Sequence, residues 1–129
     1  MNIQFKKGAL ELCVLVLIAN KDQYGYELAQ KISEKIELAE GTLYPILRRL
    51  TKEKHLTCYL SDSSEGPPRK YYSITDSGRL QLKELIEQWV PFANAVNEFI
   101  AEGTEGHATS RVYRADGETA AEHPPSGEE

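Results

Sequence analysis

Residues 40–50 read Glu-Gly-Thr-Leu-Tyr-Pro-Ile-Leu-Arg-Arg-Leu, and this stretch decides the fold. Its apolar residues recur at steps of three and four, a pattern typical of an amphipathic helix; they are Leu43, Ile46, Leu47 and Leu50. Pro45 has no N–H to donate, so it should lie near the first turn. We therefore expect a helix that begins close to Gly41 and extends over about residues 40–54.

The outward face of this helix suits contact with DNA. With about 100° between successive residues, the side chains opposite and beside the leucine face are Gly41, Thr42, Tyr44, Pro45, Arg48, Arg49 and Lys52. Short side chains at the N-terminal end permit close approach to bases, and basic ones at the C-terminal end supply charge for phosphates. Because the major groove admits a helix, we interpret the stretch as a recognition helix.

The flanking sequence predicts the other elements of a winged helix-turn-helix. Apolar periodicity and β-forming runs give helices over about 6–20, 24–35 and 76–101 and strands over about 55–60 and 69–74. The loop between the strands holds Gly-Pro-Pro at 66–68, which indicates a hairpin. Thr75 is placed to cap the last helix. The expected fold is mainly α with a small β-hairpin, a winged helix-turn-helix over 1–75 that is followed by a long C-terminal helix.

The hairpin and the second helix add candidate DNA contacts. Arg69 and Lys70 follow the Gly-Pro-Pro tip, where a wing could reach the DNA backbone or the minor groove. Tyr24 and Tyr26 could touch phosphates through their hydroxyls or pack the second helix; we expect one to pack and one to contact DNA, and the sequence does not say which. In the second strand, the adjacent Tyr71 and Tyr72 should point to opposite faces, one to the core.

The charge distribution allows a nucleic-acid partner although the formal net charge is −5. Residues 1–100 carry 13 basic and 13 acidic side chains, whereas residues 101–129 carry two basic and seven acidic ones. Basic clusters therefore exist within a neutral segment. Charge alone would suit an ordinary solvated face equally well, but here it coincides with a recognition helix and a wing tip.

The last helix is predicted to pair with another helix. Its apolar residues keep steps of three and four along the whole length, a pattern suited to packing against another helix. The candidate homodimer interface residues are Leu85, Trp89, Phe92, Val96 and Phe99. Pro91 interrupts this pattern and could kink the helix. Residues 102–129 lose all periodicity and are interpreted as a disordered acidic tail. His107 and His123 lie in that tail without further ligands, so no metal site is expected.

Three stretches resemble signatures of the PadR family of transcriptional regulators. Residues 40–50 are similar to its recognition helix, Gly66-Pro-Pro-Arg-Lys-Tyr-Tyr-Ser-Ile-Thr-Asp-Ser-Gly78 to its wing, and Tyr24-Gly-Tyr-Glu-Leu28 to the start of its second helix. The resemblance covers about residues 5–100. The single C-terminal helix resembles the short PadR subgroup, which includes the lactococcal multidrug-sensing regulator.

The resemblance implies a homodimeric regulator that binds a double-stranded DNA operator, and we expect a repressor released by a small aromatic effector. It also implies a role for Trp89, since a tryptophan at the equivalent place in the multidrug-sensing relative stacks on planar ligands at the dimer centre. Trp89 could instead be only an interface anchor. Pro91 departs from that relative and leaves the shape of any pore open.

Other classes of function are less well supported. The apolar run 9–19 is interrupted by Glu11 and is about half the ~20 residues that a bilayer span needs, so we expect a cytoplasmic protein without a membrane partner. Two cysteines, Cys13 and Cys58, make no disulfide framework. An enzyme would have to use His55 with Cys58, which no third group orients; no cofactor is expected. A winged-helix module that binds protein instead of DNA is the main alternative.

Overall fold

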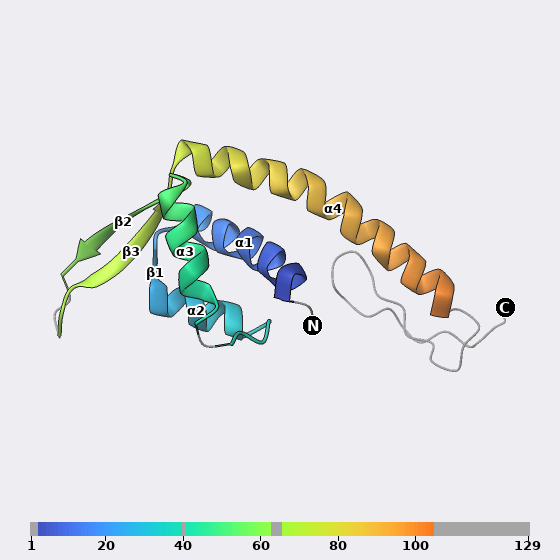
Figure 1. The fold of residues 1–129 in the computed structure, drawn as a ribbon, viewed down its shortest axis with the longest axis horizontal. Helices are drawn as coiled ribbons and strands as arrows, with labels where there is room; N and C mark the ends of the chain where they lie inside the picture. The colour runs from blue at the N-terminus through green and yellow to red at the C-terminus, as the bar shows by residue number, and fades with distance from the viewer. Residues whose placement is uncertain (1–2, 40, 63–65, 105–129) are drawn as a thin grey trace. The chain divides into compact units, whose positions relative to one another are not determined.

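A computed structural model describes residues 3–39, 41–62 and 66–104 of the chain, with side chains described from Lys7. The chain divides into two units, residues 1–85 and 86–129. Its elements (Figure 1) are α1 (Ile3–Asn20), β1 (Gln23–Tyr24), α2 (Gly25–Ser33), α3 (Leu43–Lys52), β2 (Leu56–Ser61), β3 (Arg69–Ile74) and α4 (Asp76–Thr104). The four helices and the small antiparallel sheet confirm the expected winged helix-turn-helix.

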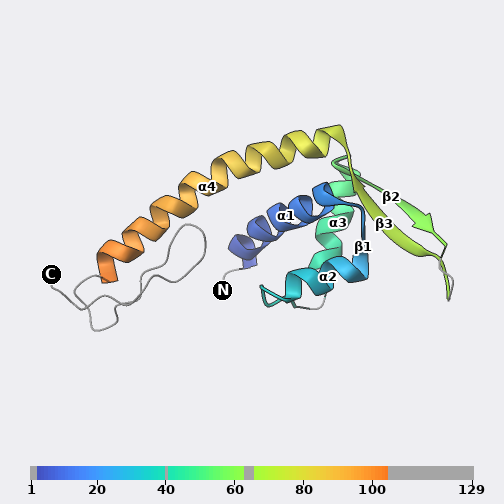
Figure 2. The ribbon, with the colours of Figure 1, turned by 180° about the vertical axis from the view of Figure 1, so that it is seen from behind.

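The first unit is built around α1, which contacts α2, α3 and β3 (Figures 1 and 2). Among the residues whose side chains are described, twelve form its core: Leu10, Val14, Leu15, Ile18, Leu28, Ile32, Leu43, Ile46, Leu47, Leu50, Leu56 and Tyr72. Burying one such aliphatic side chain is worth about 1.5–3 kcal/mol relative to exposure. The four apolar residues of α3 that were predicted to face inward are all among them.

Helix boundaries differ from the sequence prediction by one to three residues. The recognition helix begins at Leu43, two residues after Gly41 and three after residue 40, because Gly41 has a φ of 86°, in the left-handed region that a right-handed helix cannot include. It ends at Lys52, two residues early, since Lys54 also has a positive φ of 70°. The second helix stops at Ser33 instead of Lys35.

The sheet has three strands where the sequence predicted a two-stranded hairpin. The strand order is β1-β3-β2, and both neighbouring pairs are antiparallel. The extra strand β1 has only two residues, Gln23 and Tyr24, which pair with Tyr72 and Tyr71. A strand this short carries no periodicity, so its pairing with a segment far along the chain could not be read from the sequence.

The two faces of the sheet carry different side chains. Tyr72 is buried in the core, as expected for one of the two adjacent tyrosines. Tyr71 lies on the opposite face, half-buried, with the rings of Tyr24 and Tyr59 on its two sides at centroid distances of 5.8 Å each. The hydroxyl of Tyr59 donates a 2.6 Å hydrogen bond to Asp22 Oδ2, which raises the pKa of Tyr59.

The junction between the sheet and α4 is tight. Thr75 caps α4 as predicted, because its Oγ1 accepts a 2.9 Å hydrogen bond from the Gly78 N–H and donates to the Lys54 carbonyl at 2.7 Å. Gly78 is buried, and a Cβ there would lie 2.1 Å from the His55 carbonyl oxygen. Leu82 and Leu85 then pack against the core of the first unit.

The second unit contains the remaining residues of α4 up to Thr104, three residues beyond the predicted end. The helix continues through Pro91. Most of its large apolar side chains are exposed, with Phe99 the most exposed at 73%. The prediction of a disordered tail, together with His107 and His123, lies outside the described residues except for 102–104, which are helical.

Candidate nucleic-acid interface

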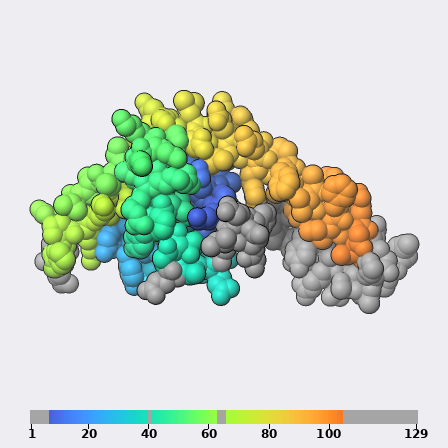
Figure 3. Space-filling model, in the orientation of Figure 1, coloured from blue at the N-terminus to red at the C-terminus, as the bar shows by residue number. Residues whose placement is uncertain are grey.

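Helix α3 lies on one face of the first unit with its outward side uncovered, as the space-filling view shows (Figure 3). The sequence pattern explains this directly, because four apolar side chains at helical spacing fix which side faces the core. The exposed side chains are Tyr44, Pro45, Arg48, Arg49 and Lys52. Thr42 precedes the helix, and its hydroxyl makes no capping hydrogen bond.

Tyr44, Pro45, Arg48 and Lys52 form one continuous strip, which we call the Arg48 strip. At the N-terminal end of this strip, the Tyr44 ring packs over Gly25 of α2, where an added Cβ would lie 3.3 Å from Tyr44 Cε1. Burial raises the pKa of Tyr72, and the positive charge of Arg48 acts in the opposite direction. In the part of the chain that the structure describes, no ion pair engages Arg48 or Lys52.

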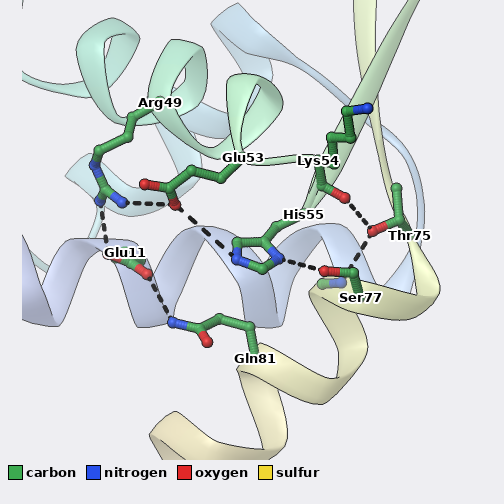
Figure 4. Close-up of polar contacts among 9 residues, drawn as sticks. Glu11, Arg49, Glu53, Lys54, His55, Thr75, Ser77 and Gln81 are labelled. Carbon is green, nitrogen blue, oxygen red and sulfur yellow. Dashed lines mark hydrogen bonds and ion pairs between the residues drawn. The ribbon is translucent and has the colours of Figure 1, made fainter.

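Arg49 differs from its neighbour Arg48 in its ion pairs. Its Nη2 donates a 2.6 Å hydrogen bond to Glu11 of α1, and its Nη1 donates to Glu53 at 3.2 Å (Figure 4). The hydrogen bond with Glu11 is the largest cause that raises the pKa of Arg49. Arg49 was expected to face DNA; its side chain is 46% exposed, and its guanidinium is bound to two carboxylates of its own chain.

Arg69 and Lys70, adjacent in strand β3 of the wing, also differ in their surroundings. Adjacent residues of a strand point to opposite faces, and the Arg69 guanidinium lies 5.0 Å from the centroid of the Tyr24 ring, in a cation–π contact. Lys70 pairs with Leu60 on the other face of the sheet, the face that carries Tyr72. Lys70, and not Arg69, therefore lies on the sheet face that carries Tyr72.

The two tyrosines at the start of α2 have different surroundings. Tyr24 is half-buried between Arg69, Tyr71 and Tyr26. Tyr26 is 57% exposed, and its hydroxyl accepts a 3.0 Å hydrogen bond from Gln30. Tyr24 therefore packs against its own chain, whereas Tyr26 is accessible to a partner.

Glu11, Glu53 and His55 lie beside α3, and none of the three was predicted to contribute to the DNA interface. Glu11 binds Arg49 and also accepts a 3.4 Å hydrogen bond from Gln81 of α4. Glu53 lies 4.0 Å from His55, whose Nδ1 is 2.8 Å from Ser77 Oγ (Figure 4). The one sequence feature that could have indicated these contacts is Glu11, a carboxylate within the apolar run 9–19.

The predicted interface residues of α4 fall into two groups. Leu85 packs against the core of its own unit and is only partly accessible. Phe92, Val96 and Phe99 are exposed in the single chain. Trp89 is half-buried, with its ring centroid 6.2 Å from that of Phe92.

A model of the transcriptional regulator PadR-like family matches residues 14–84, which include the recognition helix and the wing. The chain belongs to this family. A PadR-like transcriptional regulator of Bacillus cereus is 42% identical, with a TM-score of 0.68 over 75% of this chain and 96% of that one. A PadR family transcription regulator of Clostridium difficile is 33% identical, with a TM-score of 0.63 over 70% and 96%. A protein of Lysinibacillus sphaericus is 39% identical over 103 residues, 77% of this chain and 94% of its own.

Membership of the PadR-like family implies a DNA-binding role in the regulation of transcription. Members of the family are regulators and not enzymes, and His55, the centre of the enzymatic alternative, is hydrogen-bonded to Ser77. The described residues contain no group of three or more His, Cys, Asp or Glu side chains that could hold a metal ion. No helix in those ranges combines the length and the hydropathy that a membrane span requires.

Proposed function

We propose that this PadR-like protein is a repressor that binds a double-stranded DNA operator as a homodimer. The observation that carries the proposal is the Arg48 strip, a row of uncovered aromatic, short and basic side chains on the recognition helix. Arg48 and Lys52 are one helical turn apart, so both can follow the phosphates at one edge of the major groove. Tyr44 and Pro45, at the N-terminal end, are placed for the bases.

The proposed DNA contacts include fewer residues than the sequence alone predicted. They comprise Tyr26, Thr42, Tyr44, Pro45, Arg48, Lys52 and Lys70. Tyr24 is left out because it is half-buried against Tyr71. Arg69 and Arg49 are left out because the first lies over the Tyr24 ring and the second is bound to carboxylates.

A selection of bound sequences from random duplex DNA tests this function. We expect one enriched motif with two-fold symmetry and half-sites about one helical turn, ~34 Å, apart. Affinity for the motif should fall linearly on a log–log plot as salt rises, because bound phosphates release counterions. A winged-helix module that binds only protein would enrich no motif, and that result would overturn the proposal.

The homodimer is supported by the exposed apolar residues of α4. Six of them lie between Ile86 and Ile100, and a patch of this kind on a chain that acts alone would stay in water. Two-fold symmetry also matches the way in which helix-turn-helix dimers read paired half-sites. Sedimentation of the purified protein tests the oligomeric state directly.

A planar aromatic effector is proposed to bind at Trp89. The support is the pair of aromatic rings, Trp89 and Phe92, on the helix that would join the two subunits. A ligand there would change operator affinity only by binding one arrangement of the dimer better than another. We expect flat aromatic cations to quench the fluorescence of this single tryptophan and to weaken operator binding over the same concentrations. If a broad panel of such compounds changes neither signal, Trp89 is an interface anchor only.

A further inference from the structure

The carboxylate of Glu11 joins three helices. Its Oε1 accepts a hydrogen bond from Arg49 of α3 at 2.6 Å, and its Oε2 accepts one from Gln81 of α4 at 3.4 Å (Figure 4). The Glu11 side chain is only 15% exposed. A carboxylate this sheltered from water depends on its partners more than a surface ion pair does. Glu11 therefore fixes the recognition helix and the start of α4 against the same point of α1.

A second route leads from the same guanidinium to α4. Arg49 donates to Glu53, Glu53 lies 4.0 Å from the His55 ring, and the other nitrogen of that ring is 2.8 Å from Ser77 Oγ. Ser77 and Gln81 are four residues apart and so lie on the same side of α4. Arg49 is therefore connected to α4 by two series of contacts, one through Glu11 to Gln81 and one through Glu53 and His55 to Ser77. Figure 4 shows both as dashed lines.

These contacts indicate that Arg49 connects helices of its own chain, whereas Arg48 is available to contact DNA. Arg49 is rotated by about 100° from Arg48 around the helix axis, and its guanidinium reaches Glu11 of α1. Its guanidinium has two of its nitrogens bound to carboxylates, and such charge-assisted hydrogen bonds are among the strongest in proteins. A phosphate would have to compete with these two carboxylates for the donors of the guanidinium.

We propose that Arg49 is a positioning residue, and that Glu11 couples the base of α4 to the recognition helix through it. A displacement of residues 77–81 relative to α1 has to break or remake the Glu11 and His55 contacts, and so it changes how α3 is held. Since α4 continues from this base into the proposed dimer helix, the cluster connects the joint between subunits with the DNA-reading surface. The inference rests on the proposed DNA-binding function and adds the residues that transmit a change.

Gln81→Glu tests the coupling from the α4 side. The added carboxylate opposes Glu11 and competes for Arg49, yet it lies on neither the Arg48 strip nor the wing. We expect operator affinity to fall roughly 2- to 30-fold, the range of coupling effects between sites. Gln88→Glu adds the same charge to an exposed position two turns further along α4 and should leave affinity unchanged. Equal affinities for the two variants would overturn the proposal.

A double-mutant cycle tests the role of Arg49. Glu11→Gln and Arg49→Gln should each weaken operator binding, and the double variant should be no weaker than the worse single one, because both remove the same interaction. Glu11→Gln combined with Arg48→Gln should instead be additive. Additive effects for Glu11 and Arg49, or an unchanged affinity in Glu11→Gln, would contradict the coupling.

The salt dependence separates positioning from phosphate binding and separates this inference from the proposed function. Arg49→Gln should keep the wild-type salt slope, whereas Arg48→Gln should flatten it by about 0.9 for each phosphate that is no longer neutralised. A flattened slope in Arg49→Gln would make Arg49 a phosphate ligand and overturn the inference while leaving DNA binding intact. Failure of the wild-type protein to bind any duplex would instead refute the proposed function itself.

Discussion

The two units of the chain use the same sequence pattern with opposite results. In the winged-helix unit, apolar residues at steps of three and four are almost fully buried, as Leu47 and Leu50 of α3 illustrate. In residues 86–104 of α4, the same spacing leaves Phe92 and Phe99 exposed by 55% and 73%. Periodicity thus shows that a face will be buried, but not whether the partner belongs to the same chain. The first unit thus buries its apolar face within its own chain, whereas the exposed face of the second is the one that we propose to be buried in a homodimer.

The strongest way to break this contrast is a charge on the exposed apolar face. Val96→Asp should convert the dimer into monomers or aggregates and abolish operator binding, because an uncompensated buried charge costs about 3–5 kcal/mol. Sedimentation velocity and a DNA-binding titration measure both effects. Asn97→Asp, which adds the same charge at the adjacent polar position, is the control and should stay dimeric. An intact Val96→Asp dimer would show that the subunits meet elsewhere.

A second test compares the loss of a buried side chain in the first unit with the loss of an exposed side chain in the second. Leu47→Ala should lower the free energy of unfolding by about 2–5 kcal/mol, as expected for a fully buried leucine that leaves a cavity. In a monomeric Val96→Asp background, Phe99→Ala should change that free energy by less than about 0.5 kcal/mol, as for an exposed position. Urea titrations followed by circular dichroism give both numbers. Similar decreases at the two sites would mean that Phe99 packs within its own chain.

The junction between the sheet and α4 offers a third test. Gly78→Ala should destabilise the protein by about 1–3 kcal/mol, the usual cost of overpacking, because the new Cβ would lie 2.1 Å from the His55 carbonyl oxygen. Thermal unfolding compares it with Gly103→Ala, where an added Cβ meets nothing within 4 Å. If Gly78→Ala melts like the wild-type protein, α4 does not begin in this tight contact.

The smallest effect is expected from removal of residues 105–129. Their composition, with Val112 and Tyr113 as the only large apolar residues, gives them little to bury. The melting temperature and the oligomeric state should be nearly unchanged, and DNA affinity should rise slightly as acidic charge is removed. Calorimetry and sedimentation of the truncated protein measure this. A large decrease in stability would show that the segment docks on the folded part.

The sequence predicted those features that local chemistry controls. The buried face of α3 and the Thr75 cap follow from spacing and from one side chain at the start of a helix, and both are confirmed. Strand β1 could not be predicted, because two residues form a strand only through pairing with β3. The difference between Arg48 and Arg49 was equally hidden, since it depends on Glu11, 38 residues away from Arg49 in the chain.

The central claim is that the Arg48 strip of α3 binds DNA, and Arg48→Ala tests it most directly. The affinity of the wild-type protein and of this variant for the selected operator should be measured across a range of salt concentrations, with melting curves as the folding control. We expect binding to weaken by about 1–3 kcal/mol, the salt slope to become shallower by about 0.9 for each phosphate left without a cation, and the melting temperature to stay unchanged. Equal affinity and equal slope in a folded Arg48→Ala protein would contradict the assignment of this face to DNA.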